Sequence, residues 1–155
     1  MRSDFLNSNS SATGEYLKKV KKLTESYTVT EADSGTLFLV HPTATTELDL
    51  PTVGDLPPGW NCEVWVTEDT DGSDGGMGQI VNIDFGSGVD IVGHIASVAD
   101  AAGDTAVNAD DYINFTAAAS PGDNVQIFTD GNRWYVRGIA AALGSDTLFH
   151  TAAAS

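Results

Sequence analysis

The segment TEDTDGSDGGMG (67–78) gathers side chains that could bind a metal ion. Asp69, Asp71 and Asp74 offer hard oxygen ligands of the kind that Ca²⁺ prefers. The spacing departs from an EF-hand loop, because the glycine position is displaced and Ile80 stands where the bidentate glutamate belongs. We therefore expect a solvated hairpin loop here, with calcium binding as the alternative.

The sequence does not match other common motifs of catalytic or metal-binding sites. His41, His94 and His150 lie far apart in the sequence and form no H-x-x-x-H or H-E-x-x-H motif, so packed histidines are expected rather than a zinc site. The sequence has no G-x-S-x-G elbow and no phosphate-binding G-x-x-x-x-G-K-[ST] loop. Cys62, the single cysteine, falls within an alternating segment, where a small buried hydrophobic residue is expected. We predict no enzyme, no metal centre and no cofactor.

Carbohydrate binding is an open alternative because aromatic side chains occur on several predicted strands. Trp60, Trp65, Trp134 and Tyr135 could stack on sugar rings if exposed. Neighbouring strand residues point to opposite faces, so only one of Trp134 and Tyr135 can face the core. The other is expected to be exposed or covered by a neighbouring copy, since aromatic residues are enriched at interfaces.

The elements that would position these residues are short strands. Period-two alternation or short apolar runs occur in these segments: SYTVT (26–30), TLFLVH (36–41), TELDLP (46–51), NCEVWVTE (61–68), GQIVNIDFG (78–86), VDIVGHIASV (89–98), DDYINFTA (110–117), the hairpin DNVQIFTDGNRWYVRGIA (123–140) and DTLFHT (146–151). No helical pattern alternates with them, which argues against βαβ units. We predict an all-β protein: a single sandwich or barrel-like domain (25–155) of about nine or ten short antiparallel strands.

Charge divides the chain unevenly. The formal net charge is −15 over 155 residues, which excludes a nucleic-acid binder as the default, since phosphate contacts need lysine and arginine. Residues 1–22 nevertheless hold five of the seven basic groups against Asp4 and Glu15, whereas the rest of the chain holds Arg133 and Arg137 against the other 20 acids. No apolar run follows Arg2 and no segment is long and apolar enough to cross a membrane, so we expect neither signal peptide nor membrane span, and synthesis in a cytoplasm.

Residues 1–24 are predicted to be a basic N-terminal arm. The opening MRSDFLNSNSSATG is polar and lacks periodicity, so it should be disordered alone. The following EYLKKVKKLTES (15–26) places Tyr16, Leu17, Val20 and Leu23 near one side of a helical wheel, which predicts a short helix. A helix of about ten residues is marginal in isolation, so it should dock on its own domain or on another subunit.

The hairpin at 123–140 carries the only basic residues of the predicted β domain. Asp130–Gly131 supplies the turn, and alternation places Arg133, Tyr135 and Arg137 on one face. In so acidic a chain, the two arginines should pair with carboxylates of the same body or of a neighbouring copy.

Five segments together resemble bacteriophage virion proteins: ESYTVTEADSGTLFLV (25–40), TELDLP (46–51), GWNCEVWV (59–66), DDYINF (110–115) and GDNVQIFTDGNRWYVRG (122–138). The family is that of capsid decoration proteins, also called cement or head-stabilising proteins, together with related β modules of phage fibres. The resemblance spans about residues 25 to 140. The acidic segment 67–78 and the lysine-rich 18–22 are not part of the pattern.

The resemblance implies a non-enzymatic protein on the outer capsid surface of a virion, bound to the major capsid protein and usually a homotrimer. The acidic exterior would keep particles apart, and the arm would order on docking. The implied docking residues are Arg2, Phe5, Leu6, Tyr16, Lys18, Lys19, Val20, Lys21 and Lys22. The implied subunit or capsid contact is Arg133, Tyr135 and Arg137. The alternative is a fibre or spike module that binds host glycans through Trp60 or Trp65.

Overall fold

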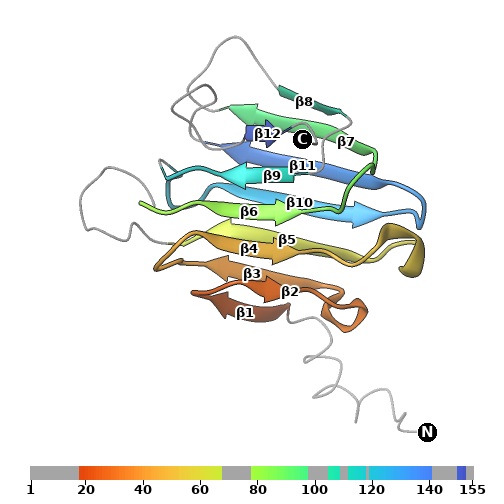
Figure 1. The fold of residues 1–155 in the computed structure, drawn as a ribbon, viewed down its shortest axis with the longest axis horizontal. Coiled ribbons are helices and arrows are strands. Elements are labelled where there is room, and N and C mark those ends of the chain that lie inside the picture. The colour runs from red at the N-terminus through yellow and green to blue at the C-terminus, as the bar shows by residue number, and fades with distance from the viewer. Residues whose placement is uncertain are drawn as a thin grey trace, which may run out of the picture.

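Strands account for most of the regular structure of this chain. The computed structural model describes residues 18–67, 78–97, 105–108, 112–117, 119–140 and 150–152, which contain twelve strands and two 3₁₀ helices (Figure 1). The strands are β1 (Lys19–Leu23), β2 (Tyr27–Thr28), β3 (Thr36–Val40), β4 (Thr46–Asp49), β5 (Asn61–Val66), β6 (Val81–Asp84), β7 (Ile91–Ser97), β8 (Thr105–Asn108), β9 (Tyr112–Phe115), β10 (Asn124–Thr129), β11 (Trp134–Ala140) and β12 (His150–Ala152). The 3₁₀ helices are η1 (Glu31–Asp33) and η2 (Val53–Asp55).

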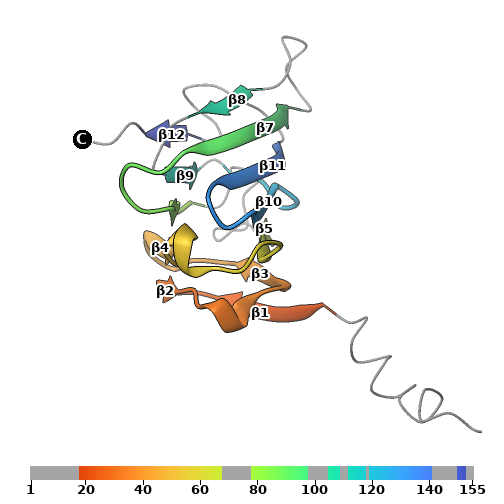
Figure 2. The ribbon, with the colours of Figure 1, turned by 90° about the vertical axis from the view of Figure 1, so that its right-hand side faces the viewer.

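The strands form two mixed sheets. The first has seven strands in the order β1-β3-β5-β10-β11-β7-β8, and the second has five in the order β12-β9-β6-β4-β2. Figure 2 shows the five-stranded sheet lying along one side of the seven-stranded sheet. The predicted all-β class is therefore confirmed.

The prediction of purely antiparallel strands is wrong. Five pairings among the described strands are parallel: β1 with β3, β3 with β5, β2 with β4, β4 with β6, and β7 with β11. A parallel pair needs a crossover connection. From β1 to β6 the chain alternates between the two sheets, so each strand of one sheet forms the crossover between two parallel strands of the other.

The predicted short helix is also wrong where it falls on described residues. Lys19–Leu23 is the edge strand β1, which pairs in parallel with β3 from Lys19–Thr36 to Leu23–Val40. Leu23 is only 5% exposed and joins the core. The sheet thus begins within the segment predicted to be an arm, because tertiary burial of Leu23 outweighs local helix propensity.

A single hydrophobic cluster contains side chains from both sheets. Phe38 and Ile127 come from the seven-stranded sheet, and Leu48 and Ile113 come from the five-stranded sheet. Residues 81, 83 and 85, and residues 125, 127 and 129, point inward with a period of two, whereas Ile80, an apolar candidate in the same segment, is 38% exposed. The inner faces are therefore fixed by the period-two pattern.

Three aromatic rings fill one part of this core. Trp134 meets both Trp60 and Phe85 edge to face, each with ring centroids 5.7 Å apart. The Trp60 indole N–H donates to the carbonyl of Glu31, at 3.0 Å, which ties η1 to the core. Such pairs add about 0.5–1.5 kcal/mol beyond their buried area.

At Gly93, two neighbouring strands approach so closely that a side chain would not fit. A Cβ on Gly93 of β7 would lie 1.8 Å from the carbonyl oxygen of Val136 on β11. The parallel pairing of β7 with β11 therefore requires glycine at this position.

Candidate functional site: the outer face of the seven-stranded sheet

The outer face of the seven-stranded sheet is defined by strand register. Residues paired across neighbouring strands point to the same side of a sheet. Their pairings align three rows of side chains across this face: Asn61, Phe128, Tyr135 and Val92; Val20, Leu37, Glu63, Gln126, Arg137 and His94; and Lys22, Leu39, Trp65, Asn124, Ile139 and Ala96. We call these rows the first, second and third rows.

This face carries many exposed apolar side chains among the described residues. Of the six large hydrophobic residues exposed in the described part of the chain, five lie on it: Val20 (56%), Ile139 (50%), Phe128 (42%), Val92 (38%) and Trp65 (36%). Half-buried Leu37 and Leu39 lie in the second and third rows. Sheets with one face on the core normally place polar residues on the other. Extended apolar surface on a protein usually marks a contact site.

The outer face of the five-stranded sheet has the opposite character. Its described side chains are polar or acidic, with Tyr112 as the only aromatic one: Thr28, Glu47, Asp49, Asn82, Asp84, Tyr112 and Asn114. Three of these are carboxylates, and no lysine or arginine is among them. On the three rows of the seven-stranded sheet, the charged residues are Lys22, Arg137 and a single carboxylate, Glu63. The two sheets therefore present surfaces of different polarity and charge.

Glu63 is the polar centre of the apolar face. It is 8% exposed, although it points away from the core. The Lys18 ammonium forms an ion pair with its carboxylate, and the Trp65 indole N–H donates to Oε1 at 2.6 Å. Burial alone would raise the pKa of Glu63, but hydrogen bonds from Lys18, Trp65 and Gln126 together hold the pKa below its usual value. Glu63 is thus a charged, fully engaged anchor that fixes the orientation of the Trp65 ring.

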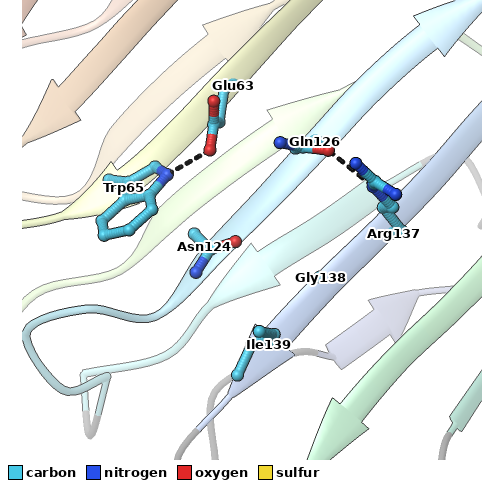
Figure 3. Close-up of a pocket in the computed structure, with 7 residues that line it drawn as sticks. All are labelled: Glu63, Trp65, Asn124, Gln126, Arg137, Gly138 and Ile139. Atoms are coloured by element: carbon cyan, nitrogen blue, oxygen red, sulfur yellow. Dashed lines mark hydrogen bonds between the residues drawn. The ribbon is translucent and has the colours of Figure 1, made fainter.

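A groove lies beside this anchor, between β5, β10 and β11 (Figure 3). Its volume is about 400 Å³, and its lining is Glu63, Trp65, Asn124, Gln126, Arg137, Gly138 and Ile139. Trp65 and Arg137 stand on opposite sides of Asn124 and Gln126 (Figure 3). Arg137 Nε donates to Gln126 Oε1 at 2.6 Å. The groove therefore combines an aromatic ring, amide groups and a cationic guanidinium.

The arginines of the hairpin have different partners. The Arg133 guanidinium pairs with the Asp90 carboxylate at 3.1 Å, as predicted for an acid of the same body. Arg137 instead bonds to a neutral amide, and in the described part of the chain no carboxylate forms an ion pair with it. Arg137 lies on the predicted face with Tyr135, while Arg133 is in the turn that precedes β11.

Tyr135 is the aromatic residue of the Trp134–Tyr135 pair that faces outward. Its ring stacks on Phe128, with centroids 5.3 Å apart and planes 15° apart, and its hydroxyl donates to Asp130 Oδ2 at 3.0 Å. That hydrogen bond raises the pKa of Tyr135. The pKa of Asp130 is lowered mainly by a hydrogen bond from the backbone N–H of Asn132, and further by the one from Tyr135. The stacked pair forms a flat aromatic surface in the first row.

Lysines predicted for capsid docking contact this chain itself. Lys18 pairs with Glu63, Lys19 Nζ donates to the carbonyls of Ala32 and Ser34 at 3.1 and 3.2 Å, and Lys21 Nζ lies 3.4 Å from the centroid of the Tyr27 ring. These contacts hold β1 at the edge of the sheet. Val20 and Lys22 are exposed on the outer face. The other predicted docking residues, Arg2, Phe5, Leu6 and Tyr16, lie outside the described residues.

The prediction that Trp60 could stack on a sugar ring is wrong. It is 1% exposed in the core, and Trp134 is fully buried, so of the three tryptophans Trp65 alone reaches the surface. Cys62 is buried as expected, and burial raises the pKa of its thiol far above the usual value. The sequence carried no signal that Glu63, which lines the groove, would be buried.

Metal binding has little structural basis in the described residues. No group of three or more histidine, cysteine, aspartate or glutamate side chains there could hold a metal ion. Most of the acidic segment predicted to be a solvated loop, with calcium binding as the alternative, lies outside the described residues, at 68–77. No helix of the described part has the length and apolar character needed to cross a membrane.

Comparison with known proteins identifies no relative. A scan against family models, a search of curated proteins and a search of solved structures each found no match. The resemblance to phage decoration proteins stays a prediction, and any functional proposal must rest on the surfaces just described.

Proposed function

We propose that this protein is a non-enzymatic structural component of a bacteriophage virion that decorates and stabilises the outer surface of the capsid. The two sheets would form a β-sandwich head on the shell, and the head would be attached through the N-terminal arm. The outer face of the seven-stranded sheet would contact the assembly, and the acidic five-stranded sheet would face solvent. The major capsid protein and further copies of this chain, as a homotrimer, are the proposed partners.

One observation carries this proposal: the contrast between the two outer faces. Removing apolar surface from water contributes about 25 cal/mol per Å², so the rows that contain Val20, Phe128 and Ile139 favour a contact in an assembly. The acidic face gains nothing from burial, because unpaired carboxylates are costly to desolvate. A shell protein present in many copies needs both surfaces, one for attachment and one that keeps particles apart.

Within the apolar face, the first row is the part proposed for subunit or capsid contact. The stacked Phe128–Tyr135 pair and Val92 supply flat apolar area, and aromatic residues are enriched at interfaces. Arg133 and Arg137 lie at the border of this row. Exposed ion pairs there would set orientation more than affinity, at about 0–1 kcal/mol each.

Rebinding to capsids tests the proposal. Capsids from the phage that encodes the chain, stripped of this protein, are mixed with the full chain, and binding is measured by co-sedimentation. We expect the full chain to rebind, and Phe128→Ala and a deletion of residues 1–17 each to weaken binding at least ~10-fold, the effect of ~1.4 kcal/mol. The deletion stops before β1, so the sheet keeps its edge strand.

Glu47→Gln, on the five-stranded sheet, is the matched control and should bind like the unchanged protein. The proposal is contradicted if the Phe128 and deletion variants rebind with unchanged affinity, or if Glu47→Gln weakens binding as much as they do. Circular dichroism and thermal unfolding of each variant separate lost binding from lost folding.

A second candidate function is a fibre or spike module that binds host glycans. The observation that favours it is the groove, with the exposed ring of Trp65 beside amide and guanidinium groups.

A further inference from the structure

We propose that the groove between β5, β10 and β11 binds a saccharide that carries a carboxylate group. The proposal concerns a ligand site and shares its ligand class with the second candidate function. It holds whether the protein sits on the capsid or on a fibre, and its test uses purified protein without capsids.

Trp65 supplies the stacking surface. Trp65 is 36% exposed on the outer face, and its indole N–H donates to Glu63 Oε1 at 2.6 Å. Glu63 is itself fixed by Lys18 and Gln126, so the ring is oriented before any ligand arrives. A fixed aromatic face binds the C–H face of a sugar ring at little cost in side-chain entropy.

Arg137 supplies a site for the negative charge. Arg137 is exposed, and within the described part of the chain its one hydrogen bond is from Nε to Gln126, so the terminal nitrogens are available for a carboxylate contact. Among the described residues no carboxylate forms an ion pair with Arg137, although the chain has 22 acidic residues. The groove contains one carboxylate, and Lys18 neutralises it.

Amide groups complete the polar lining. Asn124 and Gln126 lie between Trp65 and Arg137, where they can donate to and accept from sugar hydroxyls (Figure 3). Ile139 forms an apolar wall. The mix of one aromatic ring, apolar carbon and a few directed polar groups is typical of small-ligand sites.

The dimensions fit one or two sugar rings. Trp65 on β5 and Arg137 on β11 are two strand spacings apart, about 10 Å across the sheet. The groove volume of about 400 Å³ lies within the range of ligand pockets. The groove is lined by residues of the second and third rows, so its nearest side chains lie one row, about 7 Å, from the first row proposed for protein contact.

Binding to immobilised saccharides tests the proposal. The full-length protein is applied to hexuronate oligosaccharides and sialic acid-terminated oligosaccharides, each beside its own methyl ester, which keeps the rings and removes the charge. We expect binding to carboxylate forms and at least ~10-fold weaker binding to the esters. Trp65→Ala and Arg137→Gln should each reduce affinity at least ~10-fold, while Arg133→Gln, outside the groove, should bind normally.

Three results would overturn the proposal. The first is no binding to any carboxylate saccharide by folded protein, and the second is equal binding to acids and esters. The third is equal binding of a polyglutamate peptide, which would show that the groove recognises an acidic polypeptide. Because capsid rebinding is measured separately, loss of either proposal leaves the other standing.

Discussion

Replacing Trp60 and Trp65 separately tests which tryptophan belongs to the core and which to the surface. Trp60 is 1% exposed, and its truncation to alanine should cost about 3–5 kcal/mol, plus about 1 kcal/mol for its hydrogen bond to the Glu31 carbonyl. Trp65 is 36% exposed, so its truncation to alanine leaves no closed cavity. We expect this truncation to cost about 2 kcal/mol of stability. The difference is about 3 kcal/mol, a large part of the 5–15 kcal/mol that stabilises a typical domain.

Urea unfolding followed by circular dichroism measures both costs. With a slope of about 2 kcal/mol per M, Trp60→Ala should lower the unfolding midpoint by about 2.5 M and Trp65→Ala by about 1 M. If Trp60→Ala does not fold, Trp60→Phe, which keeps most of the ring, supplies the same comparison at lower cost. Equal destabilisation by the two alanine variants, or a greater effect at Trp65, would refute the assignment of the two rings.

Three further predictions concern packing, pH and surface charge. Gly93→Ala should destabilise by at least ~2 kcal/mol in thermal unfolding because its Cβ would overlap the Val136 carbonyl, whereas Gly54→Ala, which meets nothing within 4 Å, should change little. The lowered pKa of Glu63 means that its stabilisation is present above the usual glutamate pKa and is lost as pH falls through the lowered value. Glu63→Gln should therefore remove stability at pH 7, and the gap from the unchanged protein should close at acid pH. Arg133→Gln should lower the free energy of unfolding by at most ~1 kcal/mol at low salt and by less at high salt, since its ion pair with Asp90 is exposed. A larger loss of stability would contradict this view.

Alternation along strands was sufficient to predict the inner faces. In β5 and β10 the alternating apolar residues Cys62, Val64, Val125 and Ile127 are buried, because side chains spaced two apart on a strand share one face. The same reasoning predicted that only one of Trp134 and Tyr135 faces the core, and in the structure Trp134 is the buried one. Strand direction could not be predicted in this way, since alternation is identical in parallel and antiparallel pairs.

Two features of the structure depend on contacts between residues that lie far apart in the sequence. The segment around Val20 and Leu23 has helical spacing, yet it forms β1 because pairing with β3 and burial of Leu23 outweigh a local preference. Glu63 alternates as a solvent-facing residue, but Lys18 and Gln126 from other strands or loops surround it. The groove therefore could not be predicted from sequence, although its exposed tryptophan was a candidate.

Electron cryo-microscopy of the intact phage particle tests the central claim most directly, namely that the apolar outer face of the seven-stranded sheet contacts the assembly. The account predicts density for this chain on the capsid, with the row of Phe128, Tyr135 and Val92 against a neighbouring protein and Glu47 and Asp84 facing solvent. Density in which the five-stranded sheet meets the shell while the apolar rows remain exposed would contradict it.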